Sequence, residues 1–126
     1  MKDRTILVAE DDPSSSEMLV EMLHLEDYTV ETTDLARDTV AALRDRRFDA
    51  VLLDLSLPGM STDELVDALL HVAPRSPLIV FSARPAPEVG AVAERLGADA
   101  VLPKPADIDV MLATIADVVG RGLRAA

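Results

Sequence analysis

The chain has 126 residues, a formal net charge of −11 at pH 7 and no cysteine, and 49% of its residues are hydrophobic. The length predicts one domain, the few scattered basic residues argue against direct nucleic-acid binding, and the lack of thiols excludes disulfides. Since no apolar run is long enough for a membrane span or a secretory signal, we expect a soluble cytoplasmic protein without membrane insertion.

Short apolar runs alternate with segments of helical periodicity. The runs lie near residues 5–9, 28–32, 50–53, 78–81 and 100–102. Apolar residues of the intervening segments recur at three- and four-residue spacing, so we expect residues such as Met18, Leu70 and Ile108 to pack on a sheet. Five strands in strict alternation with five helices predict an α/β fold with a parallel sheet between two helical layers. The run at 28–32 alternates apolar and polar residues, which favours an edge position.

Helix boundaries are marked by capping residues. Asp12 followed by Pro13 is typical of an N-cap and a first helical position. Ser61 and Glu64 have the spacing of a capping box before the third helical segment. Gly97 stands where a helix C-cap glycine is expected. These signals support the same alternation of strands and helices.

Five polar residues follow four of the apolar runs directly. Glu10 and Asp11 come after the first run, Asp54 after the third, Ser82 after the fourth and Lys104 after the fifth. Ligands of open parallel α/β sheets bind outside the carboxyl ends of the strands. We therefore expect three carboxylates, one hydroxyl and one ammonium group to converge at one sheet edge.

The chemistry of these groups favours a divalent cation together with a phosphoryl group. Two carboxylates about 4 Å apart repel by on the order of 4 kcal/mol at an effective dielectric constant near 20, so a cation is needed unless protons stay bound. Mg2+ is the natural choice, because it prefers oxygen ligands. Lys104 and Ser82 suit phosphoryl oxygens, which leaves Asp54 free to act as a nucleophile toward phosphorus.

Four segments carry a resemblance to a known family. They are residues 6–12 (ILVAEDD), 52–60 (LLDLSLPGM), 81–83 (FSA) and 102–105 (LPKP). In this order and spacing they resemble the receiver domain of bacterial two-component response regulators, over nearly the whole chain. The resemblance implies a three-layer, doubly wound (βα)5 flavodoxin-like fold with strand order 2-1-3-4-5. It also implies a single receiver domain over residues 1–126, with no output domain in this chain.

The resemblance further implies a phosphorelay function. Asp54 would accept a phosphoryl group from a histidine kinase or a histidine phosphotransfer protein and then signal to a downstream protein target. Glu10, Asp11, Asp54 and the backbone carbonyl of Ser56 would hold Mg2+, while Ser82 and Lys104 would bind phosphoryl oxygens. We expect no enzymatic turnover beyond self-phosphorylation and slow self-dephosphorylation, and a monomer or weak dimer.

The chain departs from the family pattern at several positions. Val101 replaces the usual aromatic residue three before the lysine, Ala106 replaces a common phenylalanine, and Thr62 stands in a segment that is commonly Asp-Gly. Arg84 lies two residues after Ser82, a position that in the family tunes the access of water to the phosphoryl group. Arg84 either shields that group or is simply solvated, and the sequence does not decide between the two.

Two other functions stay open. One, which these departures motivate, is a receiver-like protein-binding module that signals without phosphorylation. The other is a Mg2+-dependent phosphohydrolase, although such enzymes usually carry an Asp-x-Asp pair after the first strand, and here the first strand is followed by Glu10-Asp11-Asp12-Pro13.

Overall fold

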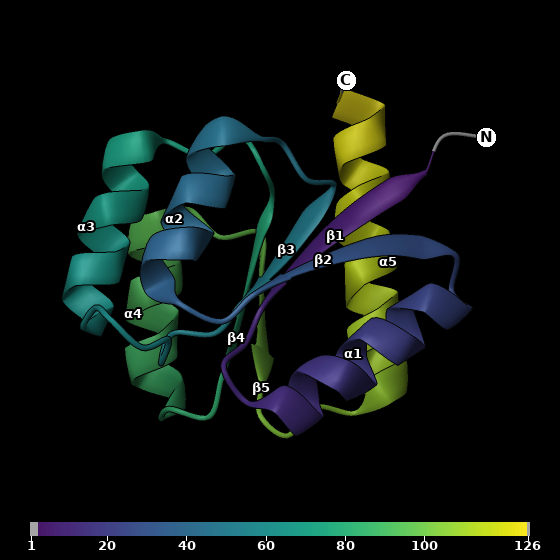
Figure 1. The fold of residues 1–126 in the computed structure, drawn as a ribbon, viewed down its shortest axis with the longest axis horizontal. Coiled ribbons are helices and arrows are strands. Elements are labelled where there is room, and N and C mark those ends of the chain that lie inside the picture. The colour runs from purple at the N-terminus through teal and green to yellow at the C-terminus, as the bar shows by residue number, and fades with distance from the viewer. Residues whose placement is uncertain (1–2, 126) are drawn as a thin grey trace.

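A single parallel sheet forms the centre of the molecule. The computed structural model describes residues 3–125, with the side chains of residues 3–122. The strands are β1 (Arg4–Ala9), β2 (Tyr28–Thr33), β3 (Ala50–Leu53), β4 (Leu78–Ser82) and β5 (Ala100–Pro103). They pair in the order β2-β1-β3-β4-β5 (Figure 1), and each neighbouring pair is parallel. The predicted topology and the edge position of β2 are confirmed.

Helices cover both faces of this sheet. They are α1 (Pro13–Leu25), α2 (Ala36–Asp45), α3 (Thr62–Val72), α4 (Ala86–Leu96) and α5 (Ile108–Ala125). Figure 1 shows α2, α3 and α4 on one side of the strands and α1 and α5 on the other. This is the doubly wound, flavodoxin-like arrangement. None of the helices within residues 3–125 combines the length and the apolar character that crossing a bilayer requires.

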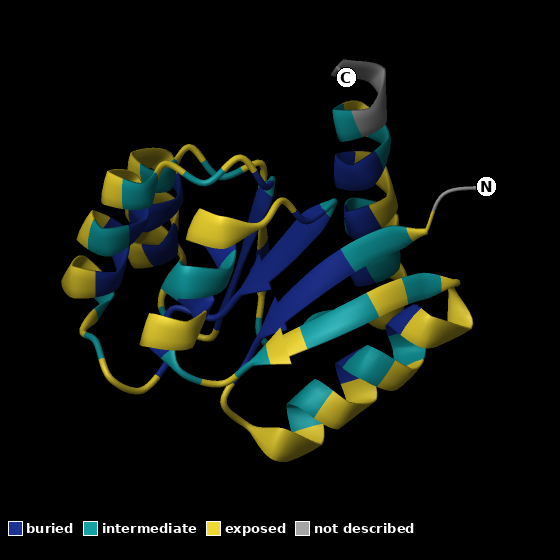
Figure 2. Cartoon of the chain, turned by 45° about the horizontal axis from the view of Figure 1, so that its top comes forward, coloured by how far each residue is buried: buried dark blue, intermediate teal, exposed yellow. Residues whose placement is uncertain are grey.

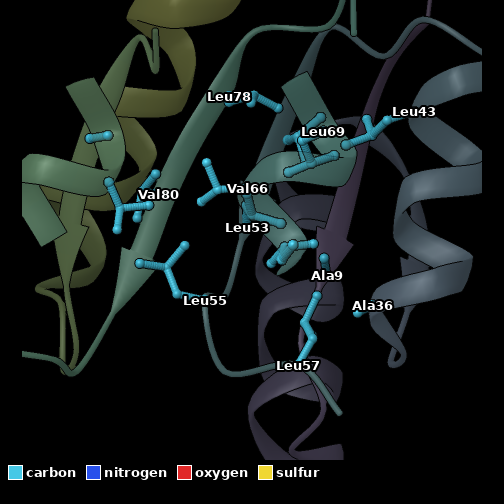
Figure 3. Packing of buried hydrophobic residues seen from close by; sticks show 14 of the residues in the cluster. Ala9, Ala36, Leu43, Leu53, Leu55, Leu57, Val66, Leu69, Leu78 and Val80 are labelled. Atoms are coloured by element: carbon cyan, nitrogen blue, oxygen red, sulfur yellow. The ribbon is translucent and has the colours of Figure 1, made fainter. Parts of the chain in front are cut away.

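The central strands separate two apolar cores. All four residues of β3 are buried, as the continuous apolar run predicts for a strand covered on both faces. Figure 2 shows the buried strands in the interior and the exposed residues on the outer helix surfaces. In the core beneath α2, α3 and α4, Leu53 and Val80 pack against Val66 and Leu69 (Figure 3). Burial of each such side chain stabilises the fold by about 1.5–3 kcal/mol.

The predicted helix caps are present. Asp12 is the N-cap of α1, and its Oδ2 accepts a hydrogen bond of 2.9 Å from the Ser15 N–H. Gly97 ends α4 in the left-handed conformation, with φ of 64°. Ser61 and Glu64 form a reciprocal capping box at the start of α3. Caps therefore fix where the chain leaves the sheet edge and where it returns.

The capping box gives a first testable prediction. We expect Ser61→Ala to lower the free energy of unfolding by about 1 kcal/mol, because the Glu64 N–H loses its acceptor. Urea unfolding measures this change. The matched control is Ser14→Ala at an exposed position inside α1, for which we expect a change within about 0.5 kcal/mol. Equal effects of the two substitutions would contradict the capping role.

Three residues expected to pack on the sheet lie farther out. Met18, Leu70 and Ile108 are each about half exposed. Their neighbours along the same helices, such as Leu19 and Leu69, are fully buried. The apolar spacing therefore predicts the side of the helix that faces the sheet, but residues at the margin of that side stay in contact with water.

Candidate functional site

The backbone at the carboxyl edge of the sheet is fixed by hydrogen bonds that continue the strand ladders. The N–H groups of Glu10, Asp54 and Lys104 each donate to a carbonyl at the end of the neighbouring strand, at 3.0, 3.1 and 3.0 Å. These residues come directly after β1, β3 and β5. The side chains predicted to converge are therefore held on a rigid part of the fold.

Asp54 lies at the centre of the site with both carboxylate oxygens engaged. Its Oδ1 accepts a hydrogen bond of 2.9 Å from the Ser56 N–H, and its Oδ2 lies 3.1 Å from the Lys104 Nζ. Lys104 also donates to Glu10 Oε2. Asp54 is only 5% exposed and Glu10 only 3%. One ammonium group thus bridges two buried carboxylates that are far apart in sequence.

The environment of Lys104 keeps it charged. Burial disfavours the ammonium form, but hydrogen bonds and charges from Glu10 and Asp54 outweigh burial and raise the pKa of Lys104 above its ordinary value of 10.5. The ammonium also lies 4.8 Å from the centre of the Phe81 ring, within the range of a cation–π interaction. Lys104 is therefore a fixed positive charge at neutral pH.

Three carboxylates form a group that could bind a metal ion. Glu10, Asp11 and Asp54 each offer one oxygen, and these oxygens lie within 4.8 Å of one another. Asp11 is exposed, unlike the other two. The three carboxylates together with Lys104 have a net charge of −2, which a divalent cation would neutralise. The donor set, all oxygen and all anionic, fits a hard cation such as Mg2+.

Ser82 and Arg84 flank this cluster. Ser82 is 3% exposed, and its Oγ accepts a hydrogen bond of 3.1 Å from the Arg84 N–H, which leaves the hydroxyl proton available to another acceptor. The Arg84 Nε lies 3.4 Å from Ser56 Oγ, and its guanidinium forms an exposed ion pair of 2.8 Å with Glu88. Such i,i+4 pairs contribute about 0.3–0.5 kcal/mol. The polar partners of Arg84 are thus Ser82, Ser56 and Glu88.

The structure brings most of the predicted residues together. Glu10, Asp11, Asp54 and Lys104 lie close together. Ser82 is the last residue of β4, which lies between β3 and β5 in the sheet. Asp54 follows β3 and Lys104 follows β5. Asp12, which stands beside the acids in sequence, serves as a helix cap instead, as expected.

Sequence reasoning missed the Phe81 ring beside Lys104. Phe81 is the last residue of the apolar run at 78–81 and directly precedes Ser82. The side chains of these two residues therefore point to opposite faces of the sheet. The membership of Phe81 in the core on the α1 and α5 side agrees with this. The phenylalanine was visible in the sequence, but an aromatic residue in a buried strand ordinarily packs in the core.

Comparison with known proteins points to one family. The family model for the response regulator receiver domain matches residues 6–116. The transcriptional regulatory protein TcrA of Mycobacterium tuberculosis is 35% identical over 122 residues, covering 93% of this chain and 46% of that protein. The chain spans about half the length of the curated relatives it matches.

Solved structures agree on the fold. A CheY-like receiver domain protein from Methanospirillum hungatei JF-1 superposes with a TM-score of 0.88 at 24% identity, covering 99% of this chain and 100% of that one. The chemotaxis response regulator CheY4 of Vibrio cholerae gives a TM-score of 0.79 at 26% identity, covering 93% and 99% of the two chains.

Proposed function

Because the chain belongs to the response regulator receiver domain family, we propose that it accepts a phosphoryl group on Asp54 and signals through protein–protein contacts. The observation that carries this proposal is the position of Asp54, buried, bridged by Lys104 to Glu10 and next to an oxygen cluster suited to a metal ion. Receiver domains of response regulators interact with histidine kinases, so we propose a histidine kinase or a histidine phosphotransfer protein as the donor.

In the proposed transfer, a carboxylate oxygen of Asp54 forms a bond to phosphorus while the P–N bond of the donor phosphohistidine breaks. The electron pair leaves with the imidazole, which takes up a proton from water. Ser56 orients the acceptor through its N–H bond to Oδ1. Lys104, already 3.1 Å from Oδ2, and the free hydroxyl proton of Ser82 then bind oxygens of the transferred group.

We assign the cation to Glu10, Asp11, Asp54 and the backbone carbonyl of Ser56, with Mg2+ as the ion. When bound, it supplies the positive charge that offsets the negative charge of the phosphoryl group. Asp11 is the exposed member of the acid cluster, so it is placed to meet an ion arriving from solvent.

Removal of the Asp11 carboxylate gives a testable prediction. We expect Asp11→Asn to weaken Mg2+ binding by about tenfold or more, because one of three anionic ligands is lost. A titration with MgCl2 followed by amide NMR shifts measures the affinity. The control is Asp12→Asn, which keeps a good N-cap and should leave the affinity near that of the wild type. Equal affinities of wild type and Asp11→Asn would contradict the assignment.

The proposed function is tested by incubating the protein with acetyl phosphate and Mg2+ and recording the intact mass. We expect the mass to increase by one phosphoryl group, and this increase to disappear when EDTA is present. A protein that never gains the phosphoryl group would contradict the proposal and favour a binding module that signals without phosphorylation. We expect no turnover of other phosphate esters, only slow self-dephosphorylation.

The proposal also covers the domain organisation, the cellular compartment, the oligomeric state and the target. We place residues 1–126 in one receiver domain that acts in the cytoplasm, as a monomer or weak dimer, on a downstream protein target.

A further inference from the structure

One side chain connects the two loops that flank Asp54. Ser56, in the loop after β3, donates its N–H to Asp54 Oδ1 at 2.9 Å. The Arg84 Nε, from the loop after β4, donates to the hydroxyl of the same Ser56 at 3.4 Å. The Arg84 guanidinium also binds Glu88 in the first turn of α4, at 2.8 Å. The guanidinium of Arg84 therefore links Ser56, which is hydrogen-bonded to Asp54, to the start of α4.

We propose, on the basis of the proposed function above, that phosphorylation of Asp54 draws the Arg84 guanidinium away from Glu88 and onto the phosphoryl group. Arg84 is then a positioning residue and a switch. The exchange leaves Glu88 as an unpaired anion at the start of α4, and this change of surface charge is the signal.

The two partners compete unequally for the guanidinium. The pair with Glu88 is exposed to solvent, with 34% and 46% of the two side chains accessible, so water and salt weaken it. A phosphoryl group carries about two negative charges and three acceptor oxygens at pH 7. The planar guanidinium can bind two of these oxygens at once. The new group therefore outcompetes a single exposed carboxylate.

The cost of leaving Glu88 unpaired is small because of its position. Glu88 lies in the first turn of α4, where the positive end of the helix dipole stabilises an anion. The helix can therefore keep this negative charge after Arg84 has left. Its N-cap is Pro85, which makes no side-chain cap hydrogen bond, whereas the Arg84–Glu88 ion pair links the preceding loop to this turn.

The local backbone favours a movement of the side chain over a movement of the loop. Pro85 and Pro87 fix the backbone on both sides of Ala86. A long, charged side chain such as Arg84 can carry the signal across a stiff loop.

The experiment is a double-mutant cycle with beryllofluoride and Mg2+ as a stable mimic of the phosphoryl group. Its affinity is measured by amide NMR titration of the wild type, Arg84→Ala, Glu88→Gln and the double variant. We expect Arg84→Ala to weaken binding about tenfold and Glu88→Gln to tighten it several-fold, because the guanidinium is already free. In the double variant, Glu88→Gln should have no effect of its own.

A second readout follows the guanidinium directly. The Arg84 Nε–Hε resonance should shift when the mimic binds to the wild type, and Glu88→Gln should shift it part of the way without the mimic. The matched control is Glu94→Gln at an exposed position of the same helix, which should change neither readout. Because all these side chains are partly or fully exposed, the variants should unfold close to the wild-type temperature.

The outcomes separate this inference from the proposed function. If the wild type fails to bind beryllofluoride, the phosphoacceptor function itself is wrong and the exchange falls with it. If the wild type binds the mimic but Arg84→Ala binds equally well, only the exchange is overturned. An equal effect of Glu88→Gln in the presence and absence of Arg84 would also overturn it, since the glutamate would then act without the guanidinium.

Discussion

Replacing Asp54 by asparagine should reduce labelling by acetyl phosphate to background, a loss of about a hundredfold or more, because an amide is not a nucleophile toward phosphorus. The fold should survive, since the asparagine carbonyl can still accept the Ser56 N–H that now binds Asp54 Oδ1. Intact mass measures the labelling, and circular dichroism confirms that the variant is folded.

The control for this substitution is Asp12→Asn. Asp12 lies at the same edge of the sheet, two residues after Glu10, but its side chain caps α1. Asparagine is an equally good N-cap, so this variant should be labelled like the wild type. Equal labelling of Asp54→Asn and the wild type would place the phosphoryl group on another residue.

Replacing Lys104 by methionine should have the second large effect, on stability as well as on labelling. The substitution leaves the buried carboxylates of Glu10 and Asp54 without the cation that now bridges them. Loss of one partner of a buried ion pair costs about 3–5 kcal/mol, but Lys104 is 22% exposed, so we expect about 2 kcal/mol without metal at pH 7. Added Mg2+ should restore part of this loss.

Urea unfolding in EDTA and in MgCl2 measures both effects. The control is Arg37→Met, which removes a cation from the exposed pair between Arg37 and Asp38 and should change stability by less than about 1 kcal/mol. Labelling of Lys104→Met should fall as well, because the variant lacks the ammonium group that we propose to bind the transferred oxygens. A variant that is as stable as the wild type in EDTA would show that the bridge does not stabilise the fold.

The arrangement of the fold could be predicted from local patterns. The run at 50–53 is apolar throughout and becomes the central strand β3, whereas the alternating run at 28–32 becomes the edge strand β2. Both follow from how many faces of a strand are buried. The capping box of Ser61 and Glu64 could also be predicted from the sequence, because it depends on residues that are close together in the chain.

The convergence of the acids and Lys104 was predictable for a topological reason. Residues that directly follow parallel strands must share one edge of the sheet, and the ladder bonds to Glu10, Asp54 and Lys104 show why little freedom remains. The strand order itself came from the resemblance to receiver domains, since alternation of strands and helices does not fix which strands are neighbours.

Side-chain partners across loops were not predictable. The contact of Arg84 with Ser56 depends on the relative position of two loops separated by 28 residues, and no local pattern encodes it. The exposure of Met18, which is about 50%, is likewise not set by its spacing along α1. Periodicity identifies the inner side of a helix, but the width of the covered strip is a property of the packed structure.

The central claim is that the carboxylate of Asp54 carries the phosphoryl group, and the most direct measurement is chemical identification of the acceptor. Borohydride reduces an acyl phosphate to an alcohol and so converts a phosphorylated aspartate to homoserine, which peptide mass spectrometry can locate. After treatment with acetyl phosphate and Mg2+, we predict homoserine at position 54. Homoserine at position 11 or 12, or at no position in a protein that has gained the phosphoryl mass, would contradict the account.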